Sequence, residues 1–183
     1  MMTDAQFDAA IGLIAGGEKS GLKDIYTAYA RQLYQVILGI VKSPQDAEDL
    51  TADLFMKLWE NAAQYKPGSG HKRYLTVMAR NLAVDFLRKS GRQSFELDDE
   101  ESGMVVADTQ DIQTDVEGKL SFGAALDALS AKQRQIVDMH IGMQLTLQEI
   151  SDSLGIPMGT VAWNYRAAIE KLKKLYKEGE HYG

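Results

Sequence analysis

The sequence predicts an all-α protein made of two small helical domains, and three observations support this. Apolar residues recur at spacings of three and four in both halves of the chain, as they do on the buried stripe of a helix. Alternation of apolar and polar residues, the pattern of a half-buried strand, is nearly absent. The 183 residues include only three prolines, which favours long uninterrupted helices.

The N-terminal half is predicted to form three helices. The first has its apolar stripe over residues 22–40. Ser43 can then act as N-cap of a second helix, with Pro44 in its first turn and apolar residues spaced over 47–58. The glycine-containing loop 66–70 ends that helix. The stripe of the third helix consists of Leu75, Met78, Ala79, Leu82 and Phe86.

The middle of the chain is predicted to be a linker. Residues 97–119 hold eight acids against one cation, Lys119, and their apolar residues follow neither a helical nor a strand period. Repulsion between like charges keeps such a segment extended. We therefore expect a domain over residues 1–95, an acidic flexible linker over 96–119 and a second domain over 120–183.

The C-terminal half predicts a helix-turn-helix. Thr146 and Glu149 match the capping-box pattern that begins a short helix. Gly155 and Pro157 then interrupt the chain, and a longer amphipathic helix follows from Thr160. A short helix, a tight turn with glycine and a longer helix are the layout of a DNA-binding motif whose second helix lies in the major groove.

Composition excludes several kinds of protein. Without cysteine the chain forms neither disulfides nor thiolate zinc sites, and its three histidines are scattered. No apolar run is long enough to cross a membrane, and the N-terminus lacks the basic segment of a signal peptide. We expect a cytoplasmic protein without cofactor or metal. No hydrolase, metalloprotease or dinucleotide motif occurs, so we expect neither a catalytic residue nor a small-molecule substrate.

The net charge is −6, yet two short segments are basic. Residues 71–92 hold six cations against Asp85, and residues 158–177 hold five against Glu170. Such patches fit contacts with nucleic-acid phosphates, and they fit equally well two solvated helix faces. Charge alone leaves both interpretations open.

Three motifs then follow one another over nearly the whole chain outside the linker: SPQDAEDLTADLFMKLWE, YLTVMARNLAVDFLRK and LTLQEISDSLGIPMGTV. In this order they resemble the extracytoplasmic-function sigma factors of bacterial RNA polymerase. The resemblance implies two helical domains, region 2 and region 4, joined by a flexible linker. It also implies that the protein directs core polymerase to promoters and assists melting of the −10 element. The implied partners are core RNA polymerase, promoter DNA and an anti-sigma factor.

The resemblance assigns the helix that contains DAEDL to the clamp helices of the polymerase β′ subunit. Ala52 stands where the family usually has glutamine. Acids near a helix N-terminus are also favoured by the helix dipole, so they do not by themselves require a partner. The polymerase-binding residues implied are Asp46, Glu48, Asp49, Leu50, Asp53 and Lys57.

The helix after loop 66–70 is assigned by the resemblance to the single-stranded −10 element, whose bases leave the stack. Cations can follow its phosphates and Asn81 can bond a base edge. Tyr74 offers a stacking face or packs in the core, and Asp85 is interpreted as a structural partner of Arg88. Glycines in the loop permit close approach of a flipped base. The −10 residues implied are Tyr74, Arg80, Asn81, Arg88, Lys89 and Arg92.

Region 4 is assigned by the resemblance to the −35 element and the β flap. Cations that the family usually carries after Gly-Thr-Val are neutral residues here, which predicts weak contact with −35 phosphates. Asn164 and Arg166 can still bond base edges. Trp163 can stack, contact a thymine methyl or meet a protein partner. The −35 residues implied are Thr160, Ala162, Trp163, Asn164 and Arg166.

Two other functions fit parts of the sequence. One is a helix-turn-helix regulator that binds duplex DNA without polymerase, although such a regulator does not need the basic helix after loop 66–70. The other is a protein-interaction module that has lost DNA binding, which the neutral recognition helix suggests.

Overall fold

The computed structural model describes residues 1–91 and 122–180. All regular structure in these two stretches is helical, which confirms the predicted all-α class. The predicted linker, residues 96–119, and the predicted −10 residue Arg92 lie outside the described residues. The helices are α1 (Asp4–Ala15), α2 (Lys19–Val41), α3 (Pro44–Asn61), η1 (Ala62–Gln64), α4 (His71–Lys89), α5 (Phe122–Asp127), α6 (Ala131–Val137), η2 (Asp138–Gly142), α7 (Leu147–Leu154) and α8 (Met158–Glu180).

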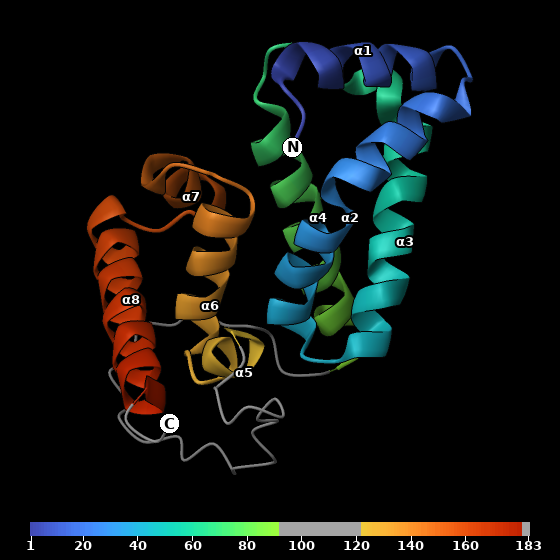
Figure 1. The fold of residues 1–183 in the computed structure, drawn as a ribbon. Helices are drawn as coiled ribbons and strands as arrows, with labels where there is room; N and C mark the ends of the chain where they lie inside the picture. Colours follow the sequence, from blue (N-terminus) through green and yellow to red (C-terminus); the bar gives the residue numbers. More distant parts are fainter. Residues whose placement is uncertain (92–121, 181–183) are drawn as a thin grey trace.

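The N-terminal half is a bundle of α2, α3 and α4, with α1 across one end (Figure 1). Its core combines most of the predicted apolar stripes with Phe7, Ile11 and Ile14 of α1, which belong to no predicted stripe. Side chains such as Ile25, Leu33, Leu54, Leu58 and Leu75 have no solvent exposure. The stripes lie on one side of each helix, so burying all of them at once requires the helices to pack side by side.

Helix α1 is fixed to the bundle at two points. At Gly21 of α2 the backbones come so close that a Cβ would lie 2.2 Å from the Ala10 carbonyl oxygen, so only glycine fits there. The buried His71, the first residue of α4, pairs with Asp4 and lies 2.5 Å from the Tyr29 hydroxyl through its Nε2. These contacts hold the start of α4, and with it the end of loop 66–70, against α1 and α2.

The predicted start of α3 is confirmed. The helix ends at Asn61, earlier than the predicted stop at loop 66–70, and the short helix η1 follows it. The Ser43 hydroxyl accepts from the Asp46 backbone N–H at 3.3 Å, and Pro44 is the first residue of α3. Lys42, just before this cap, has a φ of 60° and ends α2 in the left-handed conformation. A left-handed residue followed by a capped helix makes the sharp turn that folds α3 back along α2.

The C-terminal half contains the predicted helix-turn-helix, formed by α7 and α8. Thr146 and Glu149 form the capping box at the start of α7, and Gly155 ends the helix with a φ of +67°. Ser130 caps α6 as expected. The chain then widens into the π-helical turn η2, a feature that the sequence pattern did not indicate.

The two halves contact each other. Helix α2 packs against α6 and η2, and the N-terminal turn of α4 lies near α7 (Figure 1). Buried residues from both halves, including Val36 and Ile40 of α2 with Ile136 and Met139, belong to one continuous apolar cluster.

Candidate polymerase and DNA interfaces

The exposed side of α3 carries most of the residues assigned to polymerase binding. Glu48, Asp49, Asp53 and Lys57 are exposed, and Asp46 is half-buried at the capped N-terminus. Leu50 differs from the expectation. It is only 6% exposed and packs in the bundle core, because its position on the helix follows the stripe of Ala47 and Leu54.

Two large apolar side chains border the acids. The sequence analysis did not single out Met56, and it placed Tyr26 on the apolar stripe of residues 22–40, where the exposure of Tyr26 differs from the expectation. Met56 is 58% exposed on α3, and Tyr26 of α2 is also largely exposed, with its ring 4.9 Å from that of Phe55. Large exposed apolar side chains beside charged ones are typical of a protein-binding surface. The spacing of Ala52 and Met56, four residues apart beside Asp53, would have indicated this face.

The loop between α3 and α4 opens onto a hollow of about 500 Å³. Gly68 and Gly70 have φ values of 74° and 83°, which favour glycine and allow the chain to turn sharply into α4. The hollow is lined by both polar and apolar side chains. Its lining consists of Lys57, Ser69, Arg73, Tyr74, Val77, Met78, Asn81, Leu82 and Asp85.

Tyr74 and Asn81, both assigned to the −10 element, meet at this hollow. Tyr74 is half-buried, with its ring 5.1 Å from that of Tyr65, and burial raises the pKa of its phenol. Asn81 is exposed. The structure thus places an aromatic face and a donor–acceptor amide around one space of a size suited to a nucleobase.

The cations of α4 are divided between two places. Arg73, which the sequence analysis did not assign, lines the hollow, and its spacing from Val77 and Asn81 would have indicated this. Arg88 and Lys89 are exposed at the far end of α4, whereas Arg80 is half-buried outside the hollow. Asp85 pairs with Arg88 at 3.0 Å, as expected.

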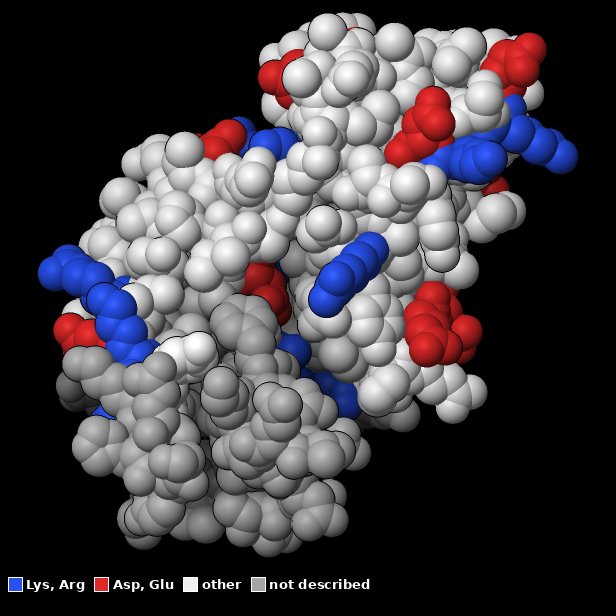
Figure 2. Space-filling view, viewed as in Figure 1, with Lys and Arg blue, Asp and Glu red and all other residues white. Residues whose placement is uncertain are grey.

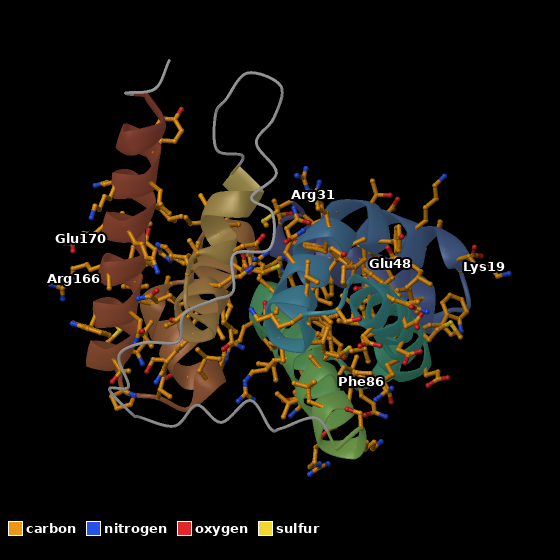
Figure 3. The ribbon with its side chains drawn as sticks, turned by 90° about the horizontal axis from the view of Figure 1, so that it is seen from below. Lys19, Arg31, Glu48, Phe86, Arg166 and Glu170 are labelled. Carbon is orange, nitrogen blue, oxygen red and sulfur yellow. The ribbon has the colours of Figure 1, made fainter. Side chains whose placement is uncertain are left out.

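The exposed side of α8 carries Trp163, which is 66% exposed, and Arg166. Arg166 and Glu170 point away from the rest of the C-terminal half (Figure 3). Thr160 and Ala162 are half-buried. On the face shown in Figure 2, the Lys and Arg side chains stand singly or in small groups, with uncharged surface or acids between the groups.

Asn164 differs from the expectation. It is only 6% exposed, and its side-chain amide donates to the Thr160 carbonyl oxygen at 2.9 Å. A side chain that is buried and bonded within its own helix does not extend toward a base edge. In this structure Asn164 therefore belongs to the packing of α8, while Trp163 and Arg166 form its accessible surface.

The sequence of each half matches a known protein family. Residues 25–93, which cover most of α2 and all of α3 and α4, match Sigma-70 region 2. Residues 125–174 match Sigma-70 region 4. The chain is a sigma factor of the sigma-70 family. It belongs to the extracytoplasmic-function group, as the resemblance in sequence predicted, and it directs transcription initiation at promoters.

Curated relatives of this sigma factor are distant but span nearly its whole length. It is 25% identical over 180 residues to the ECF RNA polymerase sigma factor SigK of Mycolicibacterium vanbaalenii, covering 94% of this chain and 90% of the relative. It is 25% identical over 173 residues to SigW of Bacillus subtilis, covering 88% and 92%. The acidic surface of α3 and the hollow beside α4 thus belong to region 2, and the helix-turn-helix belongs to region 4.

Two solved structures share the fold. The sigma factor RpoE in complex with the anti-sigma factor NepR from Bartonella quintana aligns with a TM-score of 0.61 at 24% identity, over 85% of this chain and 96% of that one. CnrH in complex with the cytosolic domain of CnrY also gives 0.61, at 16% identity, over 94% and 98%. In the part of this chain that the structure describes, no helix is long and apolar enough to cross a membrane.

Proposed function

We propose that region 2 of this sigma factor binds polymerase through the exposed side of α3 and holds an unstacked −10 base in the hollow beside α4. The observation that carries the second part is the convergence of Tyr74, Asn81 and Ser69 around one space at the end of a glycine loop. Stacking on an aromatic ring and a hydrogen bond to a base edge together favour a melted base over a stacked one. Melting then follows from binding energy, and the protein carries no catalytic chemistry of its own.

The domain bounds that accompany this proposal are residues 1–95 for region 2, 96–119 for the linker and 120–183 for region 4. Region 4 contacts the −35 element through Trp163 and Arg166 and the polymerase β flap through its remaining surface. We propose further that the protein acts in the cytoplasm and is held by an anti-sigma factor. One of the solved structures with the same fold, RpoE, is bound to the anti-sigma factor NepR, which supports that partner.

Charge reversal on α3 tests polymerase binding. Asp49→Lys combined with Asp53→Lys should abolish co-elution of the full chain with core polymerase, while helicity by circular dichroism stays unchanged because both side chains are exposed. Glu170→Lys, an exposed acid on α8, is the matched control and should co-elute normally. Normal co-elution of the double variant would mean that another surface binds polymerase.

An assay of promoter opening separates the sigma factor from a regulator that acts without polymerase. A regulator would bind duplex promoter DNA equally well with and without core polymerase. We expect instead that permanganate-reactive thymines appear around position −10 only when core polymerase and the protein are both present.

A further inference from the structure

Between positions 159 and 170, the exposed residues of helix α8 form one stripe along the helix. They recur every three or four positions, as residues on one side of a helix do: Gly159, Trp163, Arg166 and Glu170. The opposite side, with Val161, Asn164 and Ala168, is buried. Arg166 and Glu170 point away from the rest of the C-terminal half (Figure 3). The stripe is therefore the side that the second helix of the helix-turn-helix offers to a partner.

Trp163 is the only large apolar side chain on this stripe, and it is 66% exposed. Its neighbours one turn away on the stripe are Gly159, which has no side chain, and Arg166, which is a cation. A Cβ at Gly159 would meet no atom within 4 Å, so the surface one turn before Trp163 is open. The described residues thus leave most of the indole uncovered, and its apolar surface is available to a group outside the chain.

Trp163 lies in the part of α8 that suits contact with bases. Helix α8 begins at Met158, and in helix-turn-helix proteins the N-terminal residues of the second helix contact base edges in the major groove. Arg166, one turn further on, adds a positive charge that DNA attracts. Glu170 repels phosphates, so the contact with DNA is confined to about the first three turns of the helix.

Stacked base pairs offer an indole one suitable contact in the major groove. The flat faces of duplex bases are covered by the neighbouring base pairs, so a side chain in the groove meets only base edges. Those edges carry hydrogen-bond donors and acceptors, and their one apolar substituent is the C5-methyl group of thymine. An apolar side chain gains most by contact with this methyl group, because both surfaces then leave water.

The other accessible groups of the helix increase the weight of such a contact. Residues 160–167 contain one cation, Arg166, so phosphate contacts from this segment are few. Asn164, whose amide would suit adenine, is buried and donates to the Thr160 carbonyl oxygen. Arg166 suits guanine or a phosphate, which leaves Trp163 as the side chain that can recognise an A·T pair.

We propose that Trp163 determines specificity in region 4 by recognising a thymine methyl group in the major groove of the −35 element. The inference rests on the proposed function, because it requires region 4 to bind that element. It assigns the preference for an A·T pair at one position to apolar contact. The indole N–H is a single hydrogen-bond donor and is not needed for this preference.

Removing one methyl group from the DNA tests the proposal. Promoter duplexes are first selected from a random pool with core polymerase and the full chain. Each thymine of the selected −35 element is then replaced by deoxyuridine, which keeps the hydrogen-bonding edge and lacks only the C5-methyl group. At one position the replacement should weaken binding by the holoenzyme about fourfold, the change expected when one buried methyl group is lost.

Variants on α8 separate the methyl contact from other roles. Trp163→Ala should bind the thymine and deoxyuridine duplexes equally, with unchanged helicity by circular dichroism because the side chain is exposed. Trp163→Phe keeps an apolar ring without the N–H donor and should keep most of the methyl dependence. Tyr176→Ala is the matched control. It removes an aromatic side chain that is 69% exposed, roughly 20 Å further along the helix, and should leave the fourfold difference unchanged.

Equal binding of the thymine and deoxyuridine duplexes by the unmodified holoenzyme at every position would overturn the proposal. Methyl dependence that survives in Trp163→Ala would also overturn it. Weaker binding of core polymerase by Trp163→Ala, without methyl dependence in the unmodified protein, would assign the indole to a protein partner instead. If the holoenzyme selects no −35 element, the proposed function of region 4 fails together with this inference. Selection of an element without methyl dependence overturns the inference alone.

Discussion

Asn164 donates its side-chain amide to the carbonyl oxygen of Thr160, one turn earlier in the recognition helix, at 2.9 Å. Both residues lie where the sequence pattern assigns contacts with the −35 element. The bond turns Asn164 inward, against the core of region 4, and leaves Trp163 and Arg166 as the accessible side chains. The DNA-facing surface of this helix is thus narrower than its sequence suggests.

Asn164→Ala should therefore lower stability without changing base preference. Removing a buried amide that is hydrogen-bonded should cost about 1 kcal/mol of the free energy of unfolding, measured by urea denaturation of the full chain. Arg166→Ala is the matched control on the same helix and should leave stability within about 0.5 kcal/mol, since its side chain is exposed. Loss of discrimination at one −35 base pair in Asn164→Ala, with stability unchanged, would contradict the inward position.

Sequence patterns predicted the helices because caps and breaks are local. Ser43, Thr146 and Gly155 act within one turn of their own position, so spacing alone identifies them. Burial depends instead on the angle of a residue around its helix relative to neighbours that are distant in sequence. Leu50 lies on the predicted stripe of Ala47 and Leu54, and Asn164 stands three residues after the buried Val161, so spacing favours an inward position for both. The family resemblance assigned both residues to binding surfaces, although both are buried.

The contact between the two halves and the hollow could not be predicted for a related reason. Each combines residues more than ten positions apart, such as Gln35 with Arg134, and Lys57 with Asn81. Their proximity follows from how the helices pack, and no local spacing encodes it. The resemblance in sequence indicated which residue types matter on α4, but only the fold shows that Tyr74 and Asn81 share one hollow while Arg88 lies elsewhere.

The recognition helix should bind duplex DNA with a shallow salt dependence. Residues 160–167 contain one cation, Arg166, and each phosphate contact contributes roughly one unit to the slope of log affinity against log salt. Ala162→Lys should steepen the slope by about one unit and tighten binding to all sequences alike. Fluorescence anisotropy of the full chain and of its Ala162→Lys variant at several salt concentrations measures both. A steep slope without the added lysine would mean that cations further along α8 carry the contact.

Asn81 and Arg88 should contribute to promoter opening in different ways. Asn81 lines the hollow, so Asn81→Ala should reduce permanganate reactivity at the −10 bases more than it reduces closed-complex formation. Arg88 is exposed and outside the hollow, so Arg88→Ala should weaken binding through phosphate contact and flatten the salt dependence by about 0.7 unit on single strands. If both variants lose the same promoter affinity with the same salt slope, Asn81 does not bond a base.

The contact between the two halves should weaken with rising pH through Asp138. Burial raises the pKa of this carboxyl from 3.8 to about 6, although Arg134 and Lys42 oppose the change. When the halves separate, solvent reaches Asp138 and its pKa is close to the ordinary value. The protonated carboxyl therefore costs the contact nothing below about pH 3.8, and the cost grows as pH rises and is complete above about pH 6, where it approaches about 3 kcal/mol.

The contact between the halves should accordingly weaken between about pH 4 and pH 6. X-ray scattering of the full chain across this range measures the radius of gyration, at constant ionic strength so that screening does not change. Asp138→Asn keeps the shape of the side chain without the titrating group, so the radius of gyration of this variant should lose most of its pH dependence. Asp152→Asn, an exposed acid on α7, is the control and should keep the profile of the unmodified chain. The same profile in Asp138→Asn and in the unmodified chain would show that another group controls the contact, and that the buried carboxylate does not weaken it at neutral pH.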